Sequence, residues 1–257
     1  SNVLSKRHAP KRKQVMLITH FYNEEILLPY WIRHHAPMFD HAVLIDYQST
    51  DLSRKIIEEL APSTWRVVTT RAPRFKFFDA DRASQCDLEV AEWELKHPND
   101  WHIALTVTEF LVAKKIRSWL ATAYKDDQPN SLVVPSLLMT GSDTQPLDRF
   151  ESLVSQRTQY MPRSRDVYTY LYDRLLHVGL NTVTVKNESV KRFENVEHVY
   201  STTVGRHFGG VNNTDIADHA QKFGVEPHKY TNEAVILKYL WTPWPENKMR
   251  PGGRWKR

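Results

Sequence analysis

The sequence contains a single cysteine, Cys86, among 257 residues, so no disulfide can form within the chain. This cysteine usage fits a reducing compartment. No apolar run approaches the roughly 20 residues that a membrane-spanning helix requires. The first 14 residues are basic and carry no apolar stretch, so we expect neither a secretory signal nor a transmembrane segment. These absences together predict a cytoplasmic protein.

Several common catalytic motifs are also missing from the chain. There is no G-x-x-x-x-G-K-[ST] loop and no G-x-G-x-x-G, which argues against a P-loop protein and a dinucleotide-binding fold. There is no G-x-S-x-G elbow of a serine hydrolase. The twelve histidines form no zinc motif, because H-E-x-x-H is absent and only one cysteine is present.

The chain carries a formal net charge of +5 and has a pI near 9.2, a balance that is common in proteins that meet phosphates. The positive charge concentrates at the two ends, where solvated tails are the more common explanation. We expect a basic tail over residues 1–14, one domain over 15–240 and an irregular basic tail over 241–257. No nucleic-acid-binding motif accompanies the charge, so we expect no nucleic-acid partner.

The first half alternates between strand and helix patterns. Short apolar runs predict strands, and amphipathic or capped segments predict the helices between them. The expected strands are Val15–Thr19, Ala42–Ile45, Trp65–Thr70 and Trp101–Val107, and the expected helices are Glu24–His35, Leu52–Leu60 and about 82–96. This order predicts an α/β fold with a mostly parallel central sheet flanked by helices.

The second half is less regular. We expect a strand over Ser131–Met139, a helix over Glu151–Gln159, a strand over Asn181–Lys186 and a glycine-rich loop at Gly205–Val211. In open parallel sheets, ligands bind beyond the carboxyl ends of the strands. Polar and acidic residues gather at those ends, in residues 20–25, 46–51, 71–81 and 106–109.

The segment from Ile18 to Asp51 resembles the start of family-2-type glycosyltransferases, and more closely their family-92-like branch. The matching residues are Tyr22, Asn23, Glu24 and Glu25 after the first strand, Trp31 and His35 in the helix, and Asp46, Ser49, Thr50 and Asp51 after the second strand. The resemblance implies a GT-A (Rossmann-like) fold. It also implies that Asn23, Glu25 and Asp46, with Tyr22 and Asp51 in the same loops, hold the base and ribose of a nucleotide.

The resemblance continues at Trp101–Phe110 and Ser136–Asp143, and it extends to glycosyltransferase domains of large algal DNA viruses that decorate capsid proteins. It implies a nucleotide-binding half over 15–112 and an acceptor half over 113–240. The implied activity is transfer of a hexose or deoxyhexose, such as glucose or rhamnose, from a UDP-linked donor to a glycan or glycoprotein. The alternative is a glycosyltransferase-like module that binds sugar or nucleotide without turnover.

The chain departs from the family at its metal site, where Thr106 and Thr108 replace the usual pair of aspartates. Threonine hydroxyls are poor ligands for Mn²⁺ or Mg²⁺. The enzyme therefore works without a metal, holds it elsewhere, or is inactive. Asp79 and Asp81 offer a second D-x-D spacing, with helix capping as the alternative role, and His207 is a further metal candidate whose alternative is a structural hydrogen bond.

Two carboxylates are candidates for the base that activates the acceptor hydroxyl. Glu109 follows the fourth expected strand, where an idle buried carboxylate would be costly, so it is a candidate base or metal ligand. Asp143 is the rival base, with an ordinary Asx turn as its alternative role. Arg206 and Lys238 are candidates for neutralising the diphosphate, although we favour solvated surface charges for both.

Overall fold

In the computed structural model, the chain is described at residues 13–71, 89–90, 92–94, 96–97, 100–123, 131–140, 146–161, 174–178, 183–184, 199–200, 229–231 and 233–239. The expected tail over 241–257 and nearly all of the tail over 1–14 lie outside these residues. None of the described helices has the length and apolar character to span a membrane.

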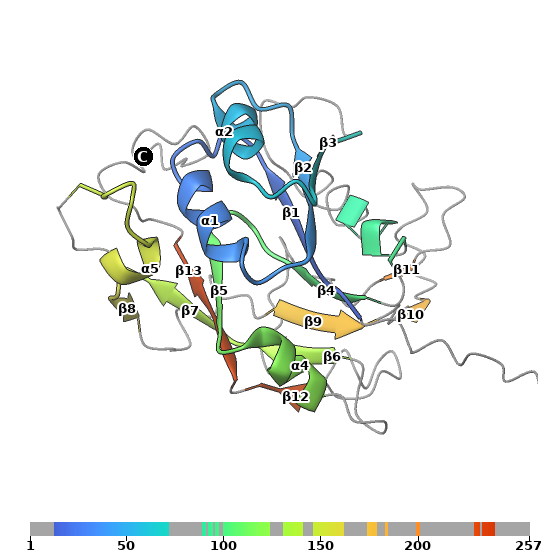
Figure 1. The fold of residues 1–257 in the computed structure, drawn as a ribbon. Helices are drawn as coiled ribbons and strands as arrows, with labels where there is room; N and C mark the ends of the chain where they lie inside the picture. Colours follow the sequence, from blue (N-terminus) through green and yellow to red (C-terminus); the bar gives the residue numbers. More distant parts are fainter. Residues whose placement is uncertain are drawn as a thin grey trace, which may run out of the picture.

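A seven-stranded sheet forms the centre of the fold, in the order β12-β6-β9-β4-β1-β2-β3 (Figure 1). Its strands are β1 (Val15–Phe21), β2 (His41–Asp46), β3 (Trp65–Thr69), β4 (Trp101–Ala104), β6 (Ser131–Val134), β9 (Arg174–Val178) and β12 (Lys229–Tyr230). Strands β3, β2, β1 and β4 are mutually parallel, and β9 runs antiparallel between β4 and β6. The expected α/β class with a mostly parallel sheet is confirmed.

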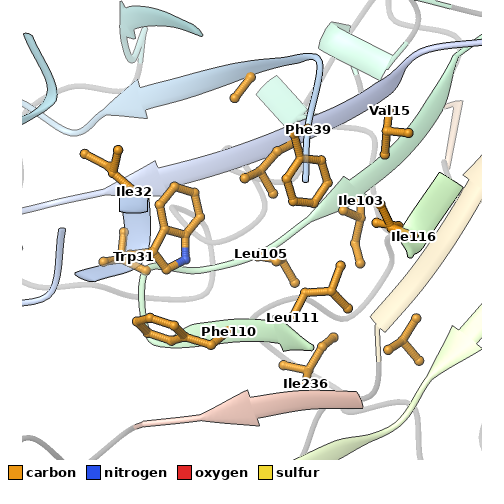
Figure 2. Packing of buried hydrophobic residues seen from close by; sticks show 14 of the residues in the cluster. Val15, Trp31, Ile32, Phe39, Ile103, Leu105, Phe110, Leu111, Ile116 and Ile236 are labelled. Carbon is orange, nitrogen blue, oxygen red and sulfur yellow. The ribbon is translucent and has the colours of Figure 1, made fainter. Parts of the chain in front are cut away.

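Strands β1, β2 and β4 are buried on both faces, which explains their continuous apolar sequences, whereas β3 at the end of the sheet is partly exposed. Side chains at alternate positions of β1 enter different clusters: Val15 and Leu17 pack with helix α1 (Leu28–His35), whereas Met16 and Ile18 pack with Val90. Helix α2 (Ser53–Leu60) lies beside α1 and adds Ile57 to the first cluster. Figure 2 shows part of this larger cluster, around a buried tryptophan of α1, Trp31.

A second, four-stranded sheet joins distant parts of the chain, in the order β5-β13-β7-β8. It contains β5 (Glu109–Ala113), β13 (Ala234–Lys238), β7 (Ser136–Met139) and β8 (Tyr160–Met161). The remaining elements are α4 (Ile116–Ala123), α5 (Leu153–Gln156) and the antiparallel pair β10 (Val183–Thr184) and β11 (Val199–Tyr200). Since β5 pairs with β13, residues on both sides of position 113 share one sheet. The division into 15–112 and 113–240 stays a prediction.

Some expected boundaries are wrong, each for a local reason. The helix expected from Glu24 begins at Leu28, because Pro29 occupies its first turn and the preceding residues form a turn. The strand expected over Ser131–Met139 is divided at Pro135 into β6 and β7, which belong to different sheets. Proline has no N–H group to donate to a ladder, so it is a natural break between two strands.

Candidate functional site

Two loops meet at the carboxyl edge of the parallel sheet. One follows β1 at residues 22–25 and the other follows β2 at residues 47–53. They lie side by side because Phe21 and Asp46, the last residues of the two strands, are register partners. Asn23, Glu25, Asp46 and Asp51, which sequence reasoning grouped, are therefore brought together at one edge.

Asn23 joins the two loops through its backbone and its side chain. Its N–H donates to Ser49 Oγ at 3.1 Å, and its Oδ1 accepts from the backbone N–H of Thr50 at 2.7 Å. Its Nδ2 donates to Thr50 Oγ1 at 3.2 Å. Asn23 has a φ of 53°, a left-handed conformation that asparagine tolerates better than most residues. The residue is only 6% exposed, so Asn23 acts mainly as a link between the loops.

Glu25 and Asp51 form a reciprocal pair of side-chain to backbone hydrogen bonds. The Glu25 N–H donates to Asp51 Oδ2 at 3.1 Å, and the Leu52 N–H donates to Glu25 Oε2 at 3.0 Å. Asp51 Oδ1 accepts from the N–H of Ser53, at the start of α2, at 3.0 Å. Asp51 therefore serves both the loop and the first turn of the helix, while Glu25 remains exposed to solvent.

Asp46 is 2% exposed and uses both carboxylate oxygens within the chain. Its Oδ1 accepts from the Ser49 N–H at 2.8 Å, and its Oδ2 lies 3.1 Å from Nε of Arg54. The side chain of Arg54 is 48% exposed, so the pair reaches from the sheet edge to the surface. In this arrangement Asp46 shapes the second loop and orients Arg54.

Glu89 extends the same edge beyond β3. Its Oε1 accepts from Thr70 Oγ1 and from the backbone N–H of Arg71, each at 2.9 Å. Arg71 in turn donates to Glu92 at 2.6 Å, and this hydrogen bond raises the pKa of the guanidinium. The first residues after β3 are thus held against the segment at 89–94.

The turn at Thr106–Glu109 links β4 to β5. Thr106 Oγ1 and Thr108 Oγ1 lie 2.8 Å apart, so the two hydroxyls hydrogen bond to each other. The Thr106 N–H donates to Glu109 Oε2 at 2.8 Å, and the Glu109 N–H donates to Thr106 O at 2.9 Å. The Glu109 carboxylate is therefore folded back over its own turn, and the residue is fully buried.

Lys238 lies opposite Glu109 in the small sheet. The two are register partners on β13 and β5, and Lys238 Nζ is 3.2 Å from Glu109 Oε1. Lys238 is 4% exposed, so the expectation of a solvated surface charge is wrong. The reason is strand pairing across the chain, which places the ammonium beside a buried carboxylate that requires a counterion.

Several residues along this edge are neither fully buried nor fully exposed. Five of them are His20, Tyr22, Gln48, Thr106 and Thr108. The ring of His20 lies 5.6 Å from that of Tyr47 in an edge-to-face contact, and Gln48 has a φ of 60°. Of these five, Tyr22 was singled out as a nucleotide contact by sequence reasoning. His20 and Gln48 were not, since neither residue type at a strand end is diagnostic.

Four of the expected site residues lie outside the described residues: Asp79, Asp81, Asp143 and His207. Their proposed roles as metal ligands and base therefore stay predictions. Among the described residues, one group has the residue types and spacing to hold a metal ion, His41 with His97 and Asp100. Since β2 begins at His41 and β4 begins just after Asp100, this group lies at the opposite, amino edge of the sheet.

No family model and no curated protein matches the chain. Among solved structures, it is similar to glucosyl-3-phosphoglycerate synthase from Mycobacterium tuberculosis, with a TM-score of 0.46 and 12% identity over 92% of this chain and 75% of that one. It is also similar to 4-diphosphocytidyl-2C-methyl-D-erythritol synthase from Anaerococcus prevotii, with a TM-score of 0.41 and 9% identity over 85% of this chain and 86% of that one. Similarities of this size assign neither a family nor a function.

Proposed function

We propose that the chain is a glycosyltransferase that binds a nucleotide-sugar donor at the carboxyl edge of its parallel sheet. The observation that carries the proposal is that hydrogen bonds join the loops after β1 and β2. Asn23 accepts from Thr50 of the second loop, and Asp51 accepts from Glu25 of the first. Ligands of open α/β sheets bind at this edge, and sites need supports that are fixed before the ligand arrives. The sequence resemblance to glycosyltransferases falls on these same loops.

The structure supports two kinds of contribution to this site. Asn23, Asp46 and Asp51 hold the loops in shape, because their polar atoms bind within the protein. Tyr22 and Glu25 keep solvent access and are our candidates for direct contact with the base or ribose. The donor that we propose is a UDP-linked hexose or deoxyhexose, such as glucose or rhamnose, with a glycan or glycoprotein acceptor.

The Thr106–Glu109 turn does not fit a divalent metal. Its hydroxyls bind each other, and its carboxylate is buried against Lys238. Mn²⁺ and Mg²⁺ prefer carboxylate and water oxygens, so we place no metal at this turn. Asp79, Asp81 and His207 remain our candidates for a metal held elsewhere.

Glycosyl transfer also needs a group that takes the proton of the acceptor hydroxyl if the reaction inverts the anomeric centre. The burial of Glu109 and its pairing with Lys238 disfavour it as this base, because a base must reach the acceptor. Asp143 is therefore the stronger of our two proposed bases. Cleavage of the donor places negative charge on the departing diphosphate, and Arg54 and Arg71 are cations at this edge whose side chains have solvent access.

The test is binding and hydrolysis of several nucleotide sugars, with and without Mn²⁺. We expect UDP binding in the wild type and a clear loss in Asp46→Ala, because the second loop loses its Ser49 anchor and Arg54 its partner. Glu59→Gln, which changes an exposed carboxylate in the last turn of α2, serves as the control. Wild-type affinity in Asp46→Ala, or no binding of any nucleotide by the wild type, would contradict the proposal.

The mutual hydrogen bond of Thr106 and Thr108 also favours a second candidate function, a module that binds nucleotide or sugar without turnover. The same assay separates the two. Binding of UDP with no hydrolysis or transfer of any donor favours the module. Turnover favours the enzyme, and turnover that is independent of metal would remove Asp79, Asp81 and His207 from our scheme.

A further inference from the structure

The amino edge of the parallel sheet carries a separate cluster of metal-ligating groups. His41 is the first residue of β2, and Asp100 immediately precedes β4. Strand β1 lies between β2 and β4, and His97 reaches the same place from the turn before β4. One ligand atom from each of the three side chains lies within 4.8 Å of the others.

The separations within the cluster are those of metal ligands rather than of hydrogen-bond partners. Asp100 Oδ2 lies 3.7 Å from His41 Nε2 and 3.5 Å from His97 Nδ1. Both distances are at or beyond the limit of a useful hydrogen bond. Two ligands of a tetrahedral zinc ion with bonds of about 2.1 Å are separated by about 3.4 Å, close to both values.

His41 provides a second indication. Its Nε2 atom is buried and makes no hydrogen bond with any of the described residues. A buried imidazole nitrogen without a partner is costly in a folded protein. A metal ion bound between the three side chains would coordinate this nitrogen. It would also explain why Asp100 lies at or beyond the limit of hydrogen-bond distance from both histidines.

The carboxylate is already oriented for this role. Asp100 Oδ1 accepts a hydrogen bond from the backbone N–H of Gln14 at 3.2 Å, which leaves Oδ2 directed toward the two histidines. Gln14 O in turn accepts from the Trp101 N–H at 2.8 Å, so the carboxylate is tied to the start of the sheet. Such supports outside the ligand shell are a regular feature of metal sites.

We propose that His41, His97 and Asp100 form a zinc site at the amino edge of the sheet, distinct from the nucleotide edge. Two imidazoles and a carboxylate suit Zn²⁺, and three protein ligands leave a fourth position for water. The side chains of His97 and Asp100 are 34% and 20% exposed, which gives the ion a path from solvent. Because His41 comes from β2 and the other two ligands come from the segment before β4, no motif in the sequence marks the site.

The test uses the full chain, freed of metal with a chelator and titrated with Zn²⁺ by calorimetry. His97→Gln and Asp100→Asn each remove one ligand atom, and Asp100→Asn keeps the Oδ1 acceptor for Gln14. Glu59→Gln removes an exposed carboxylate elsewhere and is the matched control. Titration with Co²⁺, followed by its visible absorption, reports directly on the ligand set.

We expect the wild type and Glu59→Gln to bind one Zn²⁺ ion more than either ligand variant. The affinity loss at this site should exceed the roughly 10–100-fold that changes outside the ligand shell produce. Zinc bound by histidines elsewhere in the chain is the same in all four proteins, so the result is the difference in zinc binding between the wild type and each ligand variant. Equal stoichiometry and affinity in the wild type and in a folded Asp100→Asn variant would overturn the proposal, as would a cobalt spectrum that both ligand variants leave unchanged.

Discussion

Replacing Lys238 with methionine should destabilise the protein more than any surface change of the same kind. Lys238 Nζ is 3.2 Å from Glu109 Oε1, and the two side chains are only 5% and 0% exposed. Methionine fills nearly the same volume without the charge. The substitution would leave the Glu109 carboxylate buried with its Thr106 hydrogen bond but without the Lys238 ammonium.

The magnitude follows from the burial of the pair. Removing one partner of a buried ion pair costs about 3–5 kcal/mol, because the remaining charge stays buried without its counterion. For a protein of this size, a loss of 1 kcal/mol lowers Tm by about 2–4 °C, so Lys238→Met should lower Tm by roughly 6–20 °C. The double variant Glu109→Gln with Lys238→Met removes both charges and should recover part of the loss.

Urea unfolding by linear extrapolation would measure the free energies of unfolding. The exposed pair of Lys55 and Glu59, whose side chains are 70% and 60% exposed, supplies the control, since Lys55→Met should cost less than about 1 kcal/mol. If Lys238→Met proves no more destabilising than Lys55→Met, the buried pair does not hold the β4–β5 turn and the reasoning fails.

Three further predictions concern other polar groups. Burial, and then the neighbouring His34, lower the pKa of His35 well below 6.5, so the stability that the neutral ring contributes is complete above pH 6.5 and is lost as the pH falls. Urea unfolding should show a loss of about 1.4 kcal/mol per pH unit below 6.5 for this histidine. A free energy of unfolding that does not change with pH in this range would contradict the prediction. Asn23→Gly keeps the positive φ but removes two side-chain hydrogen bonds between the loops. It should lower the free energy of unfolding by about 2 kcal/mol and speed amide hydrogen exchange at Thr50. An unchanged exchange rate would count against the link between the loops. Arg117→Met removes a bidentate ion pair with Asp40, in which the arginine side chain is 38% exposed. The free energy of unfolding should therefore fall by only about 1 kcal/mol, and this loss should shrink at high salt.

Much of the parallel sheet could be predicted from the sequence because β1, β2 and β4 are buried on both faces. Apolar runs such as Val15–Thr19 and Ala42–Ile45 then mark strands without help from distant residues, and the structure places β1 and β2 there. The grouping of Asn23, Glu25, Asp46 and Asp51 follows from the same topology, since parallel strands end at one edge. Their roles as nucleotide contacts stay predictions.

Features that depend on long-range pairing are not accessible in this way. The sequence alone predicts an ordinary surface cation at Lys238, and only the pairing of β13 with β5 brings it to Glu109. The tautomer of His35 is fixed in a similar manner, because its Nδ1 contacts Trp31 O at 2.9 Å while its Nε2 accepts from the Leu111 N–H at 3.1 Å. A donor on one side and an acceptor on the other require the neutral ring, and one of the two contacts comes from a different element.

The two loops at the carboxyl edge of the sheet illustrate how carboxylates that a sequence pattern assigns to a ligand can stabilise the protein itself. When a loop becomes ordered only on binding its ligand, the entropy lost in ordering it weakens the binding affinity. Here Asp46 and Asp51 bind backbone N–H groups, and Asn23 holds both loops with its own amide. The loops are therefore shaped by hydrogen bonds within the protein, and a donor bound there as we propose would find them already ordered. Substitutions at these three positions should weaken binding through loop geometry, and so should a substitution at Glu25, whose Oε2 accepts from the Leu52 N–H. A substitution at Tyr22 should weaken binding while leaving these hydrogen bonds in place.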